Sequence, residues 1–69
     1  MRFTIRQART HVGLTQEEMA QRLGINRSTY IRIEKDMSRA TVAQIRRIVQ
    51  VTGIPADWLL MEDDPAQAG

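Results

Sequence analysis

Residues 14–34 read LTQEEMAQRLGINRSTYIRIE, and the fold follows most directly from this stretch. Thr15 is followed three residues later by Glu18, which is the spacing of a capping box at the start of a helix. The apolar residues that come next share one helical face: Met19, Ala20 and Leu23. Gly24 tolerates the positive φ with which many helices end. The pattern therefore predicts a helix that runs to about Leu23.

A second helix is predicted directly after this glycine. Asn26 is a favourable N-cap, and Tyr30 and Ile33 lie on the face that would be buried. We expect the helix to end near Lys35, with Asp36 in the left-handed conformation. A tight turn therefore joins two short amphipathic helices.

Two flanking helices complete the predicted core. One covers roughly residues 3–11 and ends before the next glycine. Its apolar stripe consists of Ile5, Ala8 and Val12. The other follows a polar loop at residues 37–40, starts with a second capping box formed by Thr41 and Gln44, and closes at Gly53. The residues expected on its buried face are Val42, Ile45, Ile48 and Val49.

The C-terminal part is predicted to hold a short fifth helix and a tail. Pro55 fits a helix start, and residues 56–60 carry large apolar side chains that would cover the core. Three large residues suit either the core or a subunit contact: Trp58, Leu59 and Met61. Because no period-two apolar pattern occurs, we predict an all-α, compact five-helix domain at residues 1–61 and an acidic, disordered tail at 62–69.

The charges are unevenly distributed along the chain. Residues 1–47 carry ten basic and four acidic groups, whereas residues 48–69 carry four acidic groups and no basic one. Nine of the ten cations are Arg, whose planar guanidinium suits phosphate and the guanine edge better than Lys does. An Arg-rich coding composition explains that ratio equally well, so the position of the charges carries more weight. One end of the molecule is therefore predicted to bind anions.

The composition argues against several classes of function. There is no cysteine, and the single histidine, His11, has no second soft ligand, so no metal site is predicted. Glu17 and Glu18 are adjacent on a helix and do not face each other, and no nucleophile, base and orienting group come together. We expect no enzymatic activity, no catalytic residue and no cofactor. We also expect no membrane contact and no small-molecule ligand in so small a core.

Three segments resemble the helix-turn-helix of the Cro/C1/Xre repressor family: LTQEEMA at 14–20, LGINRSTY at 23–30 and RIE at 32–34. The DWLL ending at 57–60 is similar to the same part of lambda- and 434-type repressor N-terminal domains. The resemblance covers nearly the whole chain. It implies a lambda-repressor-like domain that binds double-stranded DNA.

The resemblance also implies which side chains contact DNA. Arg27, Ser28 and Arg32 are expected to project from the second helix of the pair toward base edges in the major groove, where Arg reads guanine O6 and N7. The residues expected on the DNA backbone are Gln16, Thr29 and Arg39. Ser28 and Thr29 are equally well explained as helix residues that bond locally, because short hydroxyl side chains do so near a helix start.

Three further positions bear on the comparison with the family. Ile31 stands where the family often has a small polar residue, and the sequence leaves three roles open: contact with a thymine methyl, packing on the preceding helix, or simple exposure. Tyr30 replaces an aliphatic residue, so its ring is expected in the core with the hydroxyl at solvent or at a polar neighbour. Arg9 and Glu34 match the family's ion pair, which is expected to be partly buried and to orient the motif.

Two functions remain after these exclusions. The first is a DNA-binding transcriptional regulator, expected to repress, that binds an inverted repeat as a homodimer; the resemblance places the dimer contact near Ile54, Pro55 and Trp58. We expect it in the bacterial cytoplasm or nucleoid, and a prophage origin is left open. The second is a protein-binding module, such as an antitoxin or adaptor, with secondary DNA affinity. Salt dependence separates them, because phosphate-dominated binding weakens steeply with salt. Whether the chain is complete or part of a longer repressor also stays open.

Overall fold

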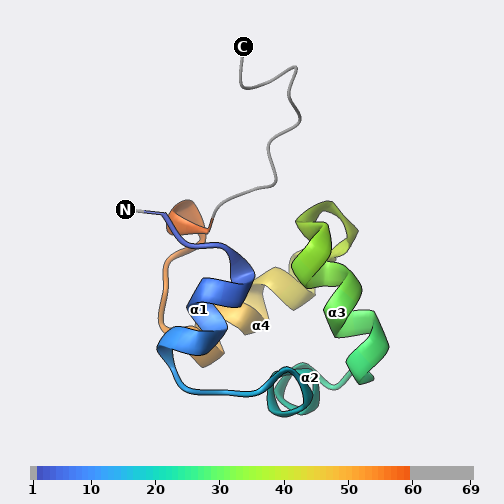
Figure 1. Ribbon diagram of the computed structural model, residues 1–69. Helices are drawn as coiled ribbons and strands as arrows, with labels where there is room; N and C mark the ends of the chain where they lie inside the picture. Colours follow the sequence, from blue (N-terminus) through green and yellow to red (C-terminus); the bar gives the residue numbers. More distant parts are fainter. Residues whose placement is uncertain (1, 60–69) are drawn as a thin grey trace.

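The computed structural model describes residues 2–59, and within them the chain is all-helical (Figure 1). Its four α-helices are α1 (Ile5–His11), α2 (Gln16–Leu23), α3 (Arg27–Lys35) and α4 (Val42–Thr52). Two short 3-10 helices, η1 (Met37–Arg39) and η2 (Ala56–Trp58), follow α3 and α4. The all-α prediction is confirmed. The predicted fifth helix is wrong in type, because only the 3-10 turn η2 forms among its described residues, 56–59.

Side chains that cap the helix N-termini explain where the helices begin. Thr15 with Glu18, and Thr41 with Gln44, form the two predicted capping boxes, and the Asn26 side chain accepts the N–H of Thr29 at 2.9 Å. A third box, formed by Thr4 and Gln7, was not predicted. Because Thr4 caps α1, that helix starts at Ile5, two residues later than the spacing predicted.

The segment after α3 differs from the prediction in two ways. Asp36 is extended, with φ −149° and ψ 97°, rather than left-handed. In this conformation its carboxylate accepts the N–H of Ser38 at 3.1 Å and starts η1, so no left-handed residue is needed. The predicted polar loop at 37–40 is therefore mostly a 3-10 turn, and it buries Met37, which is 5% exposed.

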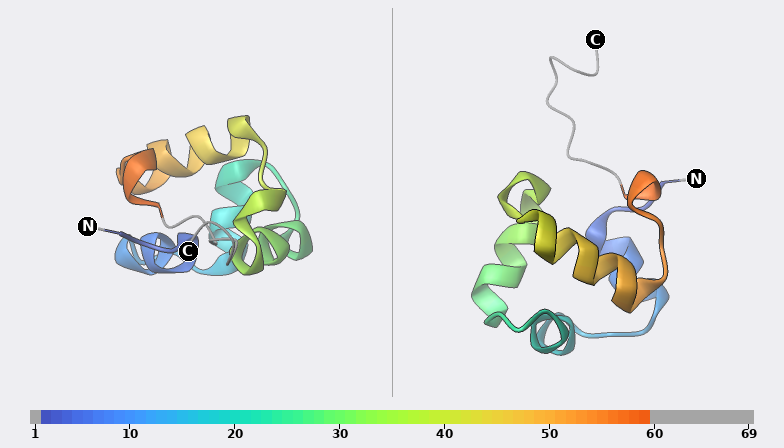
Figure 2. Two further views of the ribbon diagram at one scale, coloured as in Figure 1. Left: turned by 90° about the horizontal axis from the view of Figure 1, so that it is seen from above. Right: turned by 180° about the vertical axis from the view of Figure 1, so that it is seen from behind.

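The core takes buried residues from every helix and from both 3-10 segments or their borders. Its members are Ile5, Ala8, Met19, Ala20, Tyr30, Ile33, Met37, Ile48, Ile54 and Leu59. The left view of Figure 2, seen from above, shows α4 as one layer and α1 with α3 as the other. The prediction for Val42 is wrong: it is 70% exposed, because the inward side of α4 begins one turn later, at Ile45, and continues to Thr52.

The two ends of the described chain meet beside η2 (Figure 1). The N–H of Phe3 donates to the carbonyl of Trp58 at 2.6 Å, and Phe3 and Leu59 form a single parallel bridge. The Phe3 and Trp58 rings stack with centroids 6.5 Å apart. Leu60, Met61 and the predicted tail at 62–69 lie outside the described residues. No helix among residues 2–59 has the length and apolar character that crossing a membrane requires.

Candidate nucleic-acid interface

The α2–α3 pair is joined by a tight turn. Gly24 has φ +71°, and the N–H of Ile25 donates to the carbonyl of Ala20 at 3.0 Å, which fixes the exit from α2. Ala20 itself is only 2% exposed and belongs to the core cluster to which α3 contributes Tyr30 and Ile33. The turn therefore sets the direction in which α3 leaves.

The outward side of α3 carries the residues predicted to read bases. Arg27, Ser28 and Arg32 are all exposed, whereas Tyr30 and Ile33 are buried on the opposite side. Within residues 2–59, neither Arg27 nor Arg32 forms an ion pair. The Ser28 hydroxyl donates to the Asn26 side chain at 3.0 Å, so it takes part in the helix cap. Two guanidinium groups on this side are thus available to an outside partner.

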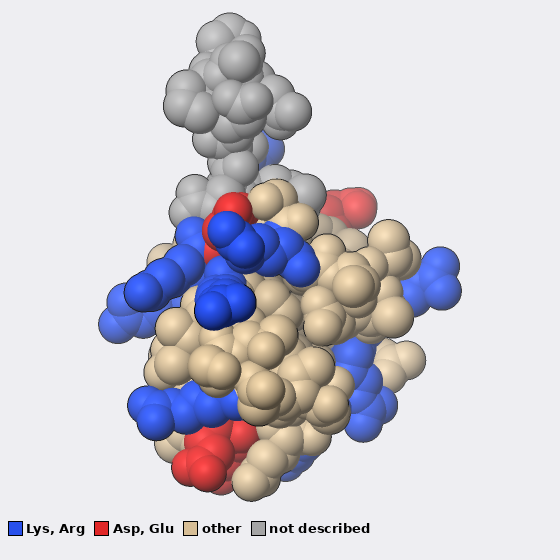
Figure 3. Space-filling view, turned by 90° about the vertical axis from the view of Figure 1, so that its right-hand side faces the viewer, with Lys and Arg blue, Asp and Glu red and all other residues tan. Residues whose placement is uncertain are grey.

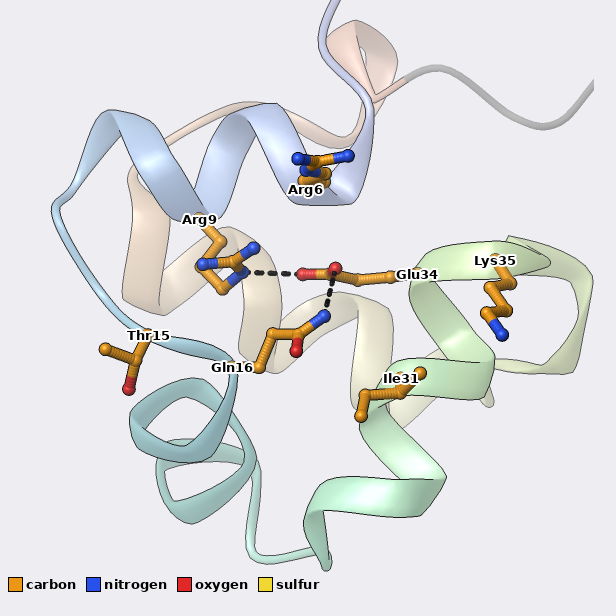
Figure 4. A pocket seen from close by; sticks show the side chains of 7 residues that line it. All are labelled: Arg6, Arg9, Thr15, Gln16, Ile31, Glu34 and Lys35. Atoms are coloured by element: carbon orange, nitrogen blue, oxygen red, sulfur yellow. Dashed lines mark hydrogen bonds and ion pairs between the residues drawn. The ribbon is translucent and has the colours of Figure 1, made fainter.

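A buried polar cluster fixes the other side of α3 (Figure 4). Arg9 Nε lies 2.6 Å from Glu34 Oε2, and the two side chains are only 11% and 6% exposed. The same carboxylate accepts the Tyr30 hydroxyl at 2.5 Å and Gln16 Nε2 at 3.0 Å. Arg9 Nη1 also donates to the carbonyl of Leu14 at 2.8 Å. One carboxylate therefore ties α1 and the start of α2 to α3.

The cluster keeps its charges at neutral pH. Burial alone would raise the pKa of Glu34, but the hydrogen bonds from Arg9, Tyr30 and Gln16 and the positive charge of Arg9 outweigh it, so this pKa lies below its usual range. Burial would lower the pKa of Arg9, and the contact with Glu34 raises it instead. Burial together with the bond to Glu34 raises the pKa of Tyr30. The ion pair and the neutral phenol are thus the stable protonation states.

Sequence reasoning anticipated the Arg9–Glu34 pair and missed how Gln16 and Tyr30 join it. Tyr30 and Glu34 are four residues apart on one helix, a spacing at which side chains meet, so that contact had a signal in the sequence. The bond from Gln16 to Glu34 crosses between two helices and had none. We call these four residues, Arg9, Gln16, Tyr30 and Glu34, the Glu34 cluster.

Two hollows lie along the basic side of the molecule. One, of about 490 Å³, opens between α1, the start of α2 and α3, and is lined by Arg6, Arg9, Thr15, Gln16, Ile31, Glu34 and Lys35 (Figure 4). The second, of about 590 Å³, is lined by Arg32, Lys35, Asp36 and Arg39. Figure 3, which faces the α3 side, shows Lys and Arg side chains around much of this face and few acidic ones. The surface is suited to a polyanion.

The remaining predicted backbone contacts are placed as follows. Thr29 is partly buried, and its N–H is taken by the Asn26 cap. Arg39 projects from η1 and is 63% exposed; its Nε lies 3.7 Å from Asp36 Oδ2, a distance at which an exposed pair is weak. Arg39 thus stays available beside the second hollow.

The predicted dimer residues separate into one core residue and two at the surface. Ile54 is 5% exposed and belongs to the core, because the chain turns inward after Gly53, so its side chain is not offered to a partner. Pro55 is exposed, and Trp58 is 41% exposed although its ring stacks on Phe3. Leu59 is buried at 3% exposure, and Met61 lies outside the described residues. The surface part of the predicted contact is therefore Pro55 and Trp58.

Two short helices joined by a glycine turn, with the second helix exposed and basic, define a helix-turn-helix domain. Residues 5–59 match the model of the helix-turn-helix family, and the chain belongs to that family. This confirms the resemblance to Cro/C1-type proteins.

Curated relatives carry the same class of name. An uncharacterized HTH-type transcriptional regulator of Methanothermobacter thermautotrophicus is 36% identical over 97% of this chain and 100% of its own length. One of Archaeoglobus fulgidus is 33% identical over 93% of this chain and 91% of its own. The HTH-type transcriptional regulator RamB of Mycobacterium tuberculosis is 38% identical over 87% of this chain. The matched region is only 13% of the length of RamB. No solved structure matches the chain significantly.

Proposed function

We propose that this chain is a sequence-specific DNA-binding transcription regulator that represses by binding an inverted-repeat operator as a dimer. The family and the names of the relatives support the general class. The observation that carries the specific proposal is the pair of exposed guanidinium groups, Arg27 and Arg32, on a helix whose inner side is fixed by a buried ion pair.

In this proposal α3 enters the major groove. Arg27 and Arg32 each donate to O6 and N7 of a guanine, and Ser28 contacts a neighbouring base edge. A base contact needs a helix held at a constant angle, and the Glu34 cluster together with the Gly24 turn supplies that constraint.

Phosphate contacts set the position of α3 on the duplex. The Gln16 amide gives one N–H to Glu34, and its second N–H is available to a phosphate beside the start of α2. Thr29 and Arg39 are proposed to contact the backbone next to it. These contacts are the same for every DNA sequence, so they contribute affinity and not base preference.

Dimerisation is proposed because one domain of this size buries too little surface to select a site in a genome. Two copies joined through Pro55 and Trp58 would place their α3 helices on half-sites about 34 Å apart. The same proposal includes the division of the chain into a DNA-binding domain at residues 1–61 and a tail at 62–69. It also includes action in the cytoplasm or nucleoid.

Selection of bound duplexes from a random DNA library at near-physiological salt tests the proposal. We expect an inverted repeat with half-sites one helical turn apart. Enrichment of a single half-site would contradict the dimer. No enrichment would contradict sequence-specific binding and favour a module that binds another protein.

Two substitutions then test the proposed roles. Arg27→Ala should relax preference at one base pair of each half-site, by about tenfold or more. Gln16→Ala should weaken binding to all sequences alike. If both substitutions act uniformly across sequences, Arg27 does not read a base.

A further inference from the structure

Ile31 is the one large apolar residue on the outward side of α3. Its neighbours there are Arg27 and Lys35, four residues away on either side, and Arg32. All three of these cationic residues are exposed, whereas Ile31 is partly buried. An aliphatic side chain gains no favourable interaction from water. We therefore ask which part of the molecule surrounds it.

The core does not account for Ile31. Eight partly buried apolar residues pack against the core, five of them beside the α2–α3 turn or on α4, and Ile31 is not among the eight. Instead it lines the hollow between α1, α2 and α3, across from Gln16 and beside Lys35 (Figure 4). Ile31 is therefore not part of the core, and its partial burial argues against simple exposure.

The proposed function puts this hollow against the edge of the major groove. Gln16 on one rim is proposed to contact a phosphate, and Arg27 and Arg32 on α3 are proposed to contact bases. The major groove displays a single large apolar group, the C5-methyl of thymine. An aliphatic side chain between a phosphate contact and two base contacts is therefore placed to meet a thymine methyl.

We propose that Ile31 is a specificity-determining residue that contacts the C5-methyl of one thymine in each half-site. The inference rests on the proposed function and names one base feature that the operator must contain. Removing that methyl should weaken binding about fourfold, because that is what burying one such group contributes.

The test uses the full chain and the duplex obtained by selection. Each thymine is replaced in turn by deoxyuridine, which removes only the C5-methyl. Affinities are measured for the unaltered protein, for Ile31→Ala and for Val42→Ala. Val42 is the matched control, since it is a branched apolar residue that is 70% exposed and lies outside α3. Ile31→Gln is a second variant with good helix propensity in case Ile31→Ala folds poorly.

We expect the unaltered protein and Val42→Ala to lose about fourfold at one thymine per half-site, and both Ile31 variants to be insensitive there. A selected half-site without thymine, insensitivity of the unaltered protein at every thymine, or full sensitivity in the Ile31 variants would each overturn this inference alone. Failure to select any sequence would contradict the proposed function as well.

Discussion

The α2–α3 side of the molecule and the end formed by η2 are attached to the same core by different interactions. At the first, the buried Glu34 carboxylate collects bonds from Arg9, Tyr30 and Gln16. At the second, a backbone hydrogen bond, a bridge between Phe3 and the buried Leu59, and a stacked ring pair join the segment to Phe3, and Trp58 remains 41% exposed. Directional, buried bonds fix an orientation, whereas a partly exposed apolar contact fixes mainly proximity.

This difference suits the proposed function. A helix that reads bases must keep its angle, because a small rotation would misplace both guanidinium groups of α3. A surface that meets a second copy can adjust through side-chain movement. Substitutions at the Glu34 cluster should therefore disturb more than those beside η2.

The largest effect is expected from Arg9→Ala. It leaves the Glu34 carboxylate buried without its cation and should lower the free energy of unfolding by about 3 kcal/mol. Denaturant unfolding followed by circular dichroism measures this. Arg6→Ala, an exposed Arg on the same helix, is the control and should change little. Arg9→Met combined with Glu34→Leu should cost less than Arg9→Ala, since no unpaired charge remains. If the double variant is the less stable one, the ion pair stabilises the fold in its own right.

Tyr30→Phe should have the next largest effect. It keeps the buried ring and removes one hydrogen bond to a charged carboxylate, which is worth about 2 kcal/mol. The same unfolding measurement tests it. DNA affinity should also fall, by the same factor for every DNA sequence. A stability equal to that of the unaltered protein would show that Arg9 and Gln16 satisfy Glu34 without the phenol.

Trp58→Ala should cost less, about 1 kcal/mol, because much of the side chain is already in water. Asp57→Ala, the exposed neighbour in η2, is its control. If Trp58 forms the proposed dimer contact, binding to an inverted repeat should fall more than binding to a single half-site. A loss of stability as large as that of Arg9→Ala would remove the contrast between the two regions.

The parts of the fold that sequence predicted well are those set by local chemistry. Thr15 with Glu18, Asn26, and Thr41 with Gln44 each mark a helix start through bonds within one turn. Two local features were missed, the Thr4–Gln7 capping box and the extended conformation of Asp36; the other misses depend on distant partners. Residues 56–58 form a 3-10 turn in a chain segment that is also held by Phe3, more than fifty residues earlier. Ile54 is buried because it turns into a core whose other members come from elements distant in sequence.

The site shows the same division. Exposure of Arg27 and Arg32 followed from the helical period alone. The bond from Gln16 to Glu34 needed the crossing of α2 and α3, which no local pattern specifies. The position of Ile31 beside a hollow was likewise undetermined until α1, α2 and α3 were placed together.

The smallest effect expected is a pH dependence confined to the Glu34 cluster. Because the folded state lowers the pKa of Glu34, its carboxylate contributes stability that is fully present above the ordinary carboxyl range, about pH 4.3, and is lost as the pH falls through the lowered value. Unfolding free energies measured from neutral to acidic pH should therefore fall more steeply for the unaltered protein than for Glu34→Gln. Hydrogen bonds also lower the pKa values of the exposed Glu18 and Asp36 carboxyls, but both proteins keep them, so they cancel in the comparison.

Trp58→Ala completes this comparison of the two regions. Trp58 stacks on Phe3 and takes no part in the bonds of the Glu34 cluster, so its variant should be less stable at every pH by the same amount and should keep the full acid slope. If Glu34→Gln and the unaltered protein lose stability in parallel, the carboxylate is not held ionised by its neighbours. If Trp58→Ala instead flattens the slope, the η2 end and the Glu34 cluster are coupled through α1, and the two regions do not act independently.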